Sequence, residues 1–166
     1  GRTNRAPVSV PAHAGGGLCE TSMSGAVRVT GNASQAAAAT GRGGLVVVEG
    51  DASARCGISL KGADIVVRGS VGHMSAFMAQ TGRLVVCGDA GEALGDSLYE
   101  AKLFVRGSVK SLGADCIEKP MRPEHRANLA ALLDRAGAAD VRPEEFRRYG
   151  SARKLYNFNI DNADAY

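Results

Sequence analysis

The sequence predicts an all-β solenoid: a right-handed parallel β-helix of about six 19-residue coils, followed by a short helical and extended C-terminal tail. Three observations point to this fold. Short apolar strings end in glycine at Gly31, Gly50, Gly69, Gly88 and Gly107, which sets a period of 19 residues, and one further step back reaches Ala12. Glycine is abundant, and 20 of the 22 glycines precede residue 114, which favours tight backbone turns there. No helical pattern interrupts this region.

Two columns of the repeat are apolar and predict the core. The position two residues before the glycine holds valine in every copy: Val10, Val29, Val48, Val67, Val86 and Val105. The position four residues before it holds Val8, Val27, Val46, Ile65, Leu84 and Leu103. Because residues two apart point to the same face of a strand, both columns are expected to fill one interior. A left-handed hexapeptide helix would need a period near 18 and an apolar residue at every sixth position, which the sequence lacks.

Three further columns describe the turns and the outside of the coil. The position after the glycine is short and polar, which suits turns in which side chains bond their own backbone: His13, Asn32, Asp51, Ser70, Asp89 and Ser108. The position just before the glycine is expected to face outward: Pro11, Thr30, Glu49, Arg68, Cys87 and Arg106. The position three before it becomes apolar from the third coil onward: Ser9, Arg28, Val47, Val66, Val85 and Phe104. An apolar outer stripe of this kind needs a cover.

The repeat ends near Cys116, so the chain divides into a β-helix at 1–117 and a helical and extended docking segment at 118–166. A helix is expected over Ala127–Arg135, with three leucines on one side, and it should cover the outer stripe or the open end of the solenoid. A second short helix is expected over Pro143–Tyr149.

The last residues combine aromatic and basic side chains, since 146–166 contains five of the eight aromatic residues of the chain. Interfaces favour tyrosine and arginine. The expected partner contacts are Arg148, Tyr149, Arg153, Lys154, Tyr156, Phe158 and Tyr166.

Composition narrows the functional class. No apolar run approaches the roughly 20 residues of a membrane span, and with a net charge of +3 no block is basic enough for nucleic-acid binding. The four cysteines form no CxxC pair, which argues against a zinc or iron–sulfur site in this chain. Reduced thiols are typical of a cytoplasmic protein.

Candidate reactive residues each have a structural alternative. Asp51 and Asp89 would lie about 9.6 Å apart, near the upper range for an inverting glycosidase, or they cap turns. His73 is a possible base or metal ligand, or is structural, with Met74 and Met78 beside it as core filler. Cys56 and Cys116 are possible nucleophiles or buried, inert thiols. The structural alternative is favoured in each case, so no catalytic, cofactor-binding or metal-binding residue is assigned.

Several strings of the chain are specific enough to identify a family resemblance. GDASARCGISLKG, DIVVRGSVGHMSAFMAQTGRLVVCGDAGEALGDS, RGSVKSLGADCIEK and RRYGSARKLYNFNIDNADAY resemble the glutamate-synthase-like GXGXG β-helix subunit of N-methylglutamate synthase, over roughly residues 23–166. That subunit is similar to the C-terminal domain of the glutamate synthase large subunit.

The resemblance implies a structural subunit without an active site of its own. It would bridge a glutamine-amidotransferase-like subunit and a synthase subunit that makes N-methylglutamate from methylamine and glutamate, in a larger hetero-oligomer. FMN and iron–sulfur clusters are expected in the synthase partner and no cofactor in this chain. The alternatives are a β-helix subunit of a formylmethanofuran dehydrogenase or formyltransferase/hydrolase-type complex and a stand-alone sugar-active β-helix enzyme.

Overall fold

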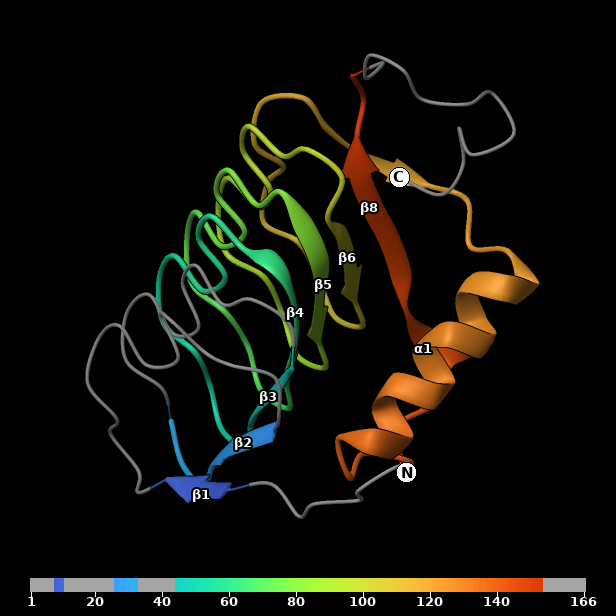
Figure 1. Cartoon of the computed structure of the whole chain (residues 1–166). Helices are drawn as coiled ribbons and strands as arrows, with labels where there is room; N and C mark the ends of the chain where they lie inside the picture. The colour runs from blue at the N-terminus through green and yellow to red at the C-terminus, as the bar shows by residue number, and fades with distance from the viewer. Residues whose placement is uncertain (1–7, 11–25, 33–43, 154–166) are drawn as a thin grey trace.

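The computed structural model describes residues 8–10, 26–32 and 44–153, which form a stack of parallel coils with one helix lying beside it (Figure 1). One sheet contains all the strands, in the order β1-β2-β3-β4-β5-β6-β8-β7. The strands are β1 (Val8–Val10), β2 (Ala26–Val29), β3 (Leu45–Val48), β4 (Lys61–Val67), β5 (Thr81–Val86), β6 (Lys102–Val105), β7 (Cys116–Lys119) and β8 (Arg147–Ser151). The helices are α1 (Pro123–Arg135) and the 3₁₀ turn η1 (Pro143–Glu145).

The strands β1 to β6 run parallel at the predicted 19-residue register. Val46 pairs with Ile65, and Ile65 pairs with Leu84, so each strand residue lies beside its counterpart one coil later. The second wall of the coil is narrower and consists of single bridges through Ala52, Val71, Ala90 and Val109. The β-solenoid predicted from the sequence is therefore confirmed.

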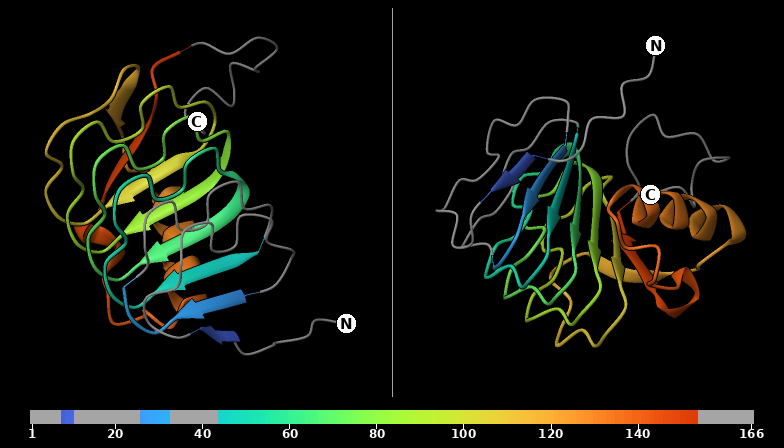
Figure 2. Two further views of the ribbon diagram at one scale, coloured as in Figure 1. Left: turned by 90° about the vertical axis from the view of Figure 1, so that its left-hand side faces the viewer. Right: turned by 90° about the horizontal axis from the view of Figure 1, so that it is seen from below.

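Over the residues that the structure describes, the solenoid has about four turns, fewer than the six that the sequence predicted. The first two strands keep the register, but the connections at 11–25 and 33–43 lie outside the described residues. After β6 the chain makes one last coil and then leaves the stack, because β7 pairs with the antiparallel β8 instead of with another parallel rung. Figure 2 shows the regular coils and the departure of the chain toward α1.

Both predicted apolar columns fill the inside of the coil. Val48, Val67 and Val86 are completely buried, and Ile65 and Leu84 pack with them in one core. Each such side chain contributes about 1.5–3 kcal/mol when it is fully removed from water. The strand hydrogen bonds are satisfied between neighbouring coils, so each rung stabilises the next.

The glycine column is required by the close approach of successive turns. A Cβ atom on Gly69 would lie 2.7 Å from the carbonyl oxygen of Gly50, and one on Gly107 would lie 2.5 Å from that of Gly88. The amide of Gly88 donates to the Gly69 carbonyl oxygen at 2.8 Å, which holds the turns at this spacing. Any larger residue would push two coils apart.

Helix α1 covers the outer stripe, as the sequence predicted. Leu129, Leu132 and Leu133 form a second core with the stripe; the stripe residues buried there are Val47, Val66, Val85 and Phe104. Figure 2 shows α1 along the face of the sheet that lies away from the coil interior.

Polar contacts tie the outer face of the sheet to the same C-terminal segment. Arg28 donates to the carbonyl oxygen of Ala136 at 2.9 Å, at the C-terminal end of α1, and pairs with Glu49. Arg68 forms two hydrogen bonds with the carboxylate of Asp140, at 3.1 and 3.0 Å. The outer face of the sheet is therefore an internal interface of the chain over these strands.

The helix predicted at Pro143–Tyr149 is wrong beyond its first turn. Only Pro143–Glu145 forms a 3₁₀ turn, and Arg147–Ser151 forms strand β8, which pairs antiparallel with both β6 and β7. The exposed edge of β6 offers backbone hydrogen bonds that a short helix could not supply, and these long-range bonds override local propensity. In the part of the chain described above, no helix combines the length and the apolar character needed to cross a membrane.

Candidate functional site

The described members of the predicted docking set lie where the chain leaves the solenoid, and two of them are buried by the chain itself. Arg148 has no exposed surface, and its Nε donates to the carbonyl oxygen of Pro120 at 2.9 Å. Tyr149 is 5 % exposed and packs into the inner core of the coil beside Leu103. Burial raises the pKa of the Tyr149 hydroxyl. Tyr149 thus closes the inner core at the last coil.

Arg153 is the described member of the docking set that reaches the surface. Its side chain is 39 % exposed. It donates from Nε to Asp115 at 3.0 Å and lies over the ring of Tyr99, 5.7 Å from its centroid. A guanidinium over an aromatic face is attracted by the ring quadrupole. Lys154, Tyr156, Phe158 and Tyr166 lie outside the described residues.

A shallow hollow of about 440 Å³ adjoins this surface. It is lined by Met78, Gln80, Thr81, Tyr99 and Glu100. Met78 and Tyr99 are 39 % and 37 % exposed, and both line this hollow. The interpretation of Met78 as core filler is therefore wrong, because the turn between coils directs this side chain outward. We call Met78, Tyr99 and Arg153 the aromatic corner.

The polar column after the glycines forms a ladder of hydrogen bonds between coils. The side-chain oxygens of Asp51 and Asp89 accept the backbone amides of Ser70 and Ser108 at 2.7 and 2.8 Å, and Ser70 accepts the amide of Asp89 at 2.9 Å. The interpretation of the aspartates as turn caps is confirmed, with one difference. Each side chain caps the next coil rather than its own turn, because residue i lies beside residue i+19.

The two candidate nucleophiles, Cys56 and Cys116, are buried. Burial raises the pKa of both Cys56 and Cys116 to about 12. The pKa of Cys87 is also raised, chiefly by burial, although Arg68 and Arg106 oppose the shift. Since the thiolate is the nucleophile, these three groups are inert near neutral pH. Cys19 lies outside the described residues.

His73 lies on an exposed turn between coils. Its backbone carbonyl oxygen accepts the amide of Arg55 at 2.9 Å and so links two coils. Over residues 8–10, 26–32 and 44–153, no group of three His, Cys, Asp or Glu side chains has the arrangement of a metal site.

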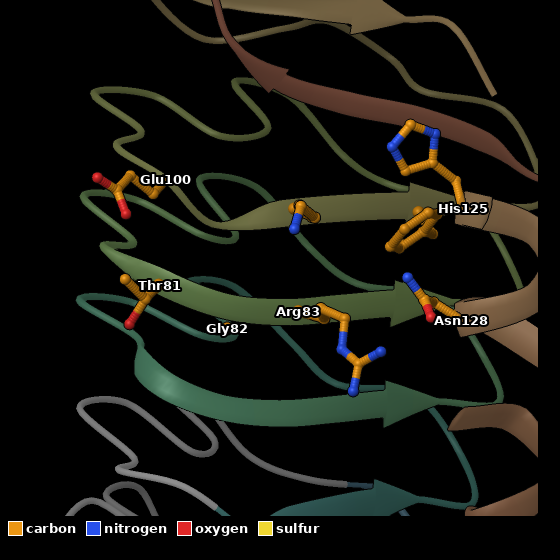
Figure 3. A pocket seen from close by; sticks show the side chains of 8 residues that line it. Thr81, Gly82, Arg83, Glu100, His125 and Asn128 are labelled. Carbon is orange, nitrogen blue, oxygen red and sulfur yellow. The ribbon is translucent and has the colours of Figure 1, made fainter. Parts of the chain in front are cut away.

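A second hollow, lined by more charged side chains, lies on the outer face of the sheet, between the first residues of β5 and β6 and the N-terminal half of α1 (Figure 3). Its volume is about 320 Å³. The lining residues are Thr81, Gly82, Arg83, Glu100, Lys102, Phe104, His125 and Asn128. We call it the Lys102 hollow.

Of the two basic side chains that line the Lys102 hollow, Arg83 has a carboxylate partner and Lys102 has none among the described residues. Arg83 binds the carboxylate of Asp64 through Nε and Nη2, both at 2.8 Å. The Nδ1 atom of His125 accepts the Arg122 amide at 3.1 Å, so this nitrogen is unprotonated. Among the described residues, Lys102 makes no ion pair. Burial lowers its pKa, and Arg148 and Arg83 lower it further, whereas Glu100 opposes the shift.

Sequence reasoning missed these residues, although the repeat contained a signal. The position five residues before the glycine reads Leu45, Asp64, Arg83 and Lys102 in successive coils. This position changes from apolar to charged after Leu45. The position two residues later, on the same face of the strand, stays apolar in these coils. Such a break in a repeat column marks the place where the outer face is not fully covered.

The chain is similar to Protein GlxC of Rhizobium meliloti (strain 1021), with 70% identity over 96 residues. The matched region covers 58% of this chain and 42% of that protein, so the chain spans less than half of the length of this relative. No protein-family profile matches the chain. No solved structure matches it either.

Proposed function

We propose that this chain is a structural subunit of a glutamate-synthase-like complex, N-methylglutamate synthase. In this role it bridges a glutamine-amidotransferase-like subunit and a synthase subunit that carries FMN and iron–sulfur clusters. The assembled enzyme makes N-methylglutamate from methylamine and glutamate. The proposal is motivated by the family resemblance of the sequence strings in the coils and in the C-terminal tail. The 70% identity to Protein GlxC over 58% of this chain supports it for that part of the chain.

The observation that carries the proposal is the use of polar side chains to stack coils. Asp51, Ser70 and Asp89 hold neighbouring turns together. Cys56 is completely buried with a raised pKa. Aspartate, serine and cysteine are catalytic residues in many enzymes. Here the aspartate and serine side chains connect neighbouring coils, and the cysteine packs in the core. A stiff rod of stacked coils suits a part that holds two larger subunits at a fixed distance.

The aromatic corner is our candidate for a partner-binding surface. Tyr, Met and Arg are enriched in interface cores, and Tyr99, Met78 and Arg153 combine these types next to a hollow. The tail sequence continues directly from Arg153 with Lys154, Tyr156 and Phe158. We propose that the corner and the tail together contact one partner subunit.

The proposal is tested by co-expressing the tagged chain with the two proposed partners and analysing the purified material by mass spectrometry and absorption spectroscopy. The expected result is a three-chain complex with the visible spectrum of FMN and iron–sulfur clusters. Absence of either partner from the purified material, with the tagged chain itself folded, would contradict the proposal.

A matched pair of variants locates the contact. Tyr99→Ala should weaken assembly at least tenfold, or about 1.4 kcal/mol. Lys110→Ala, at an exposed position of the next coil, should leave assembly unchanged.

His73→Ala should change the rate of the chemical step of the assembled complex by less than about tenfold. A thousandfold loss in the intact complex would show that this chain supplies a catalytic group.

A further inference from the structure

The Lys102 hollow contains a positive charge without an ion-pair partner. Lys102 is half-buried at the first position of β6, and no carboxylate of the described residues lies within ion-pairing distance. Burying an ammonium group is costly unless an opposite charge accompanies it. A half-buried lysine that no described carboxylate neutralises therefore suggests a ligand that the chain alone does not provide.

The neighbours of Lys102 do not neutralise its charge. Arg83 on β5 and Arg148 on β8 lie on either side of it, and both lower its pKa. Asp64 binds Arg83 and also pairs with Arg135 at 3.8 Å, and Glu100 provides one further negative charge at the other end of the hollow. The balance over Lys102, Arg83, Arg135, Asp64 and Glu100 is one positive charge.

The geometry also supplies hydrogen-bond donors. Asp64 uses only Nε and Nη2 of Arg83, so Nη1 remains for another acceptor. Asn128 extends from α1 over the same hollow, and Figure 3 shows its amide group and the Arg83 guanidinium between helix and sheet. A volume of about 320 Å³ lies at the small end of the range for ligand pockets.

We propose that the Lys102 hollow binds a small molecule through an oxyanion group, a carboxylate or a phosphate, held by Lys102, Arg83 Nη1 and the amide of Asn128. Charge-assisted hydrogen bonds to such groups are stronger than those between neutral partners. The anion relieves the repulsion between Lys102 and Arg83. This site is separate from the aromatic corner and does not depend on the proposed function.

Nuclear magnetic resonance of the full chain with ¹³C-dimethylated lysines tests the site directly. The chain is titrated with sodium phosphate and, separately, with sodium glutarate, each against sodium chloride at equal ionic strength. The Lys102 signal should shift saturably, and its pKa should rise when the anion is bound, because the bound charge stabilises the ammonium form. The Lys61 signal should not shift, since Lys61 is the exposed first residue of β4 and does not line the hollow.

Calorimetry with two lysine variants provides the second measurement. Lys102→Met should lower the affinity at least tenfold, whereas Lys61→Met should leave it within twofold. Saturation by phosphate alone or by glutarate alone supports the proposal and identifies the group. An equal response to chloride would overturn it. The small-molecule site would also be wrong if neither anion binds while Lys102→Met weakens assembly with the partner subunits, since a partner carboxylate would then occupy the hollow.

Discussion

The two faces of the sheet are covered by different parts of the chain: the inner face by the coil itself, and the outer face by the C-terminal segment. The inner face repeats one valine in every coil, and each rung is covered by the next rung and by the opposite wall of the coil. The outer face changes along the chain, from Arg28 to Phe104, and a non-repeating segment covers it. The inner face can thus be stable through the repeat alone, whereas the outer face depends on residues far away in the sequence.

The largest expected effect comes from breaking the inner face. Val67→Asp places a carboxylate in a completely buried column without a partner, which costs several kcal/mol and should abolish folding. Circular dichroism and solubility of the purified chain measure the effect. A soluble variant that melts like the wild type would show that the register of the solenoid is wrong.

The adjacent substitution on the outer face should be less damaging. Val66 is equally buried but packs beneath α1, so Val66→Asp should release α1 while the coil stack remains folded. Limited proteolysis should then cut near α1 and leave the coils resistant. Complete unfolding of this variant, equal to that of Val67→Asp, would contradict the distinction between the two faces.

Alkaline pH should weaken the inner face through its thiols. The pKa of Cys56 and Cys116 is about 12 in the folded chain, against an ordinary value of 9.0. Because the folded state keeps these protons longer, the stabilisation is fully present below pH 9 and is lost as the pH rises toward 12. Urea unfolding at several pH values measures this loss, and Cys56→Ala should reduce the slope. Rapid reaction of the native thiols with a disulfide reagent at pH 8 would contradict their burial.

The hydrogen-bond ladder makes a smaller contribution. Asp89→Ala removes the acceptor for the Ser108 amide and should cost about 1 kcal/mol, because the exposed amide can bond to water instead. Asp89→Asn keeps an acceptor oxygen at the same place and should unfold like the wild type. Equal losses for the two variants would show that the charge of Asp89, rather than the cap, matters.

The difference between the faces also explains what the sequence predicted well. The inner columns, the glycine turns and the need to cover the outer stripe all follow from a period visible within two neighbouring coils. The covering helix was recognisable because its leucines lie on one side. These features depend on local pattern and on contacts that repeat every 19 residues.

The features that sequence analysis missed depend on contacts without a period. β8 became a strand because the edge of β6 is free, and β6 lies more than 40 residues earlier. The same pairing buries Arg148 and Tyr149, which looked like surface docking residues. The Lys102 hollow lies between α1 and the first residues of β5 and β6. The charged column of the repeat indicates where the cover ends, but the hollow itself depends on how α1 packs on the sheet, which has no period.

The coils form the scaffold, and we propose that the C-terminal residues join it to its partners. A chain that ends at Arg153 tests this claim most directly, through its melting temperature and its assembly with the amidotransferase-like and synthase subunits. We expect a melting temperature within about 2 °C of the full chain, since the described core is intact, which corresponds to less than about 1 kcal/mol. We also expect the complex to be lost. A shortened chain that still assembles but melts many degrees lower would show that residues 154–166 cap this chain and do not dock to a partner.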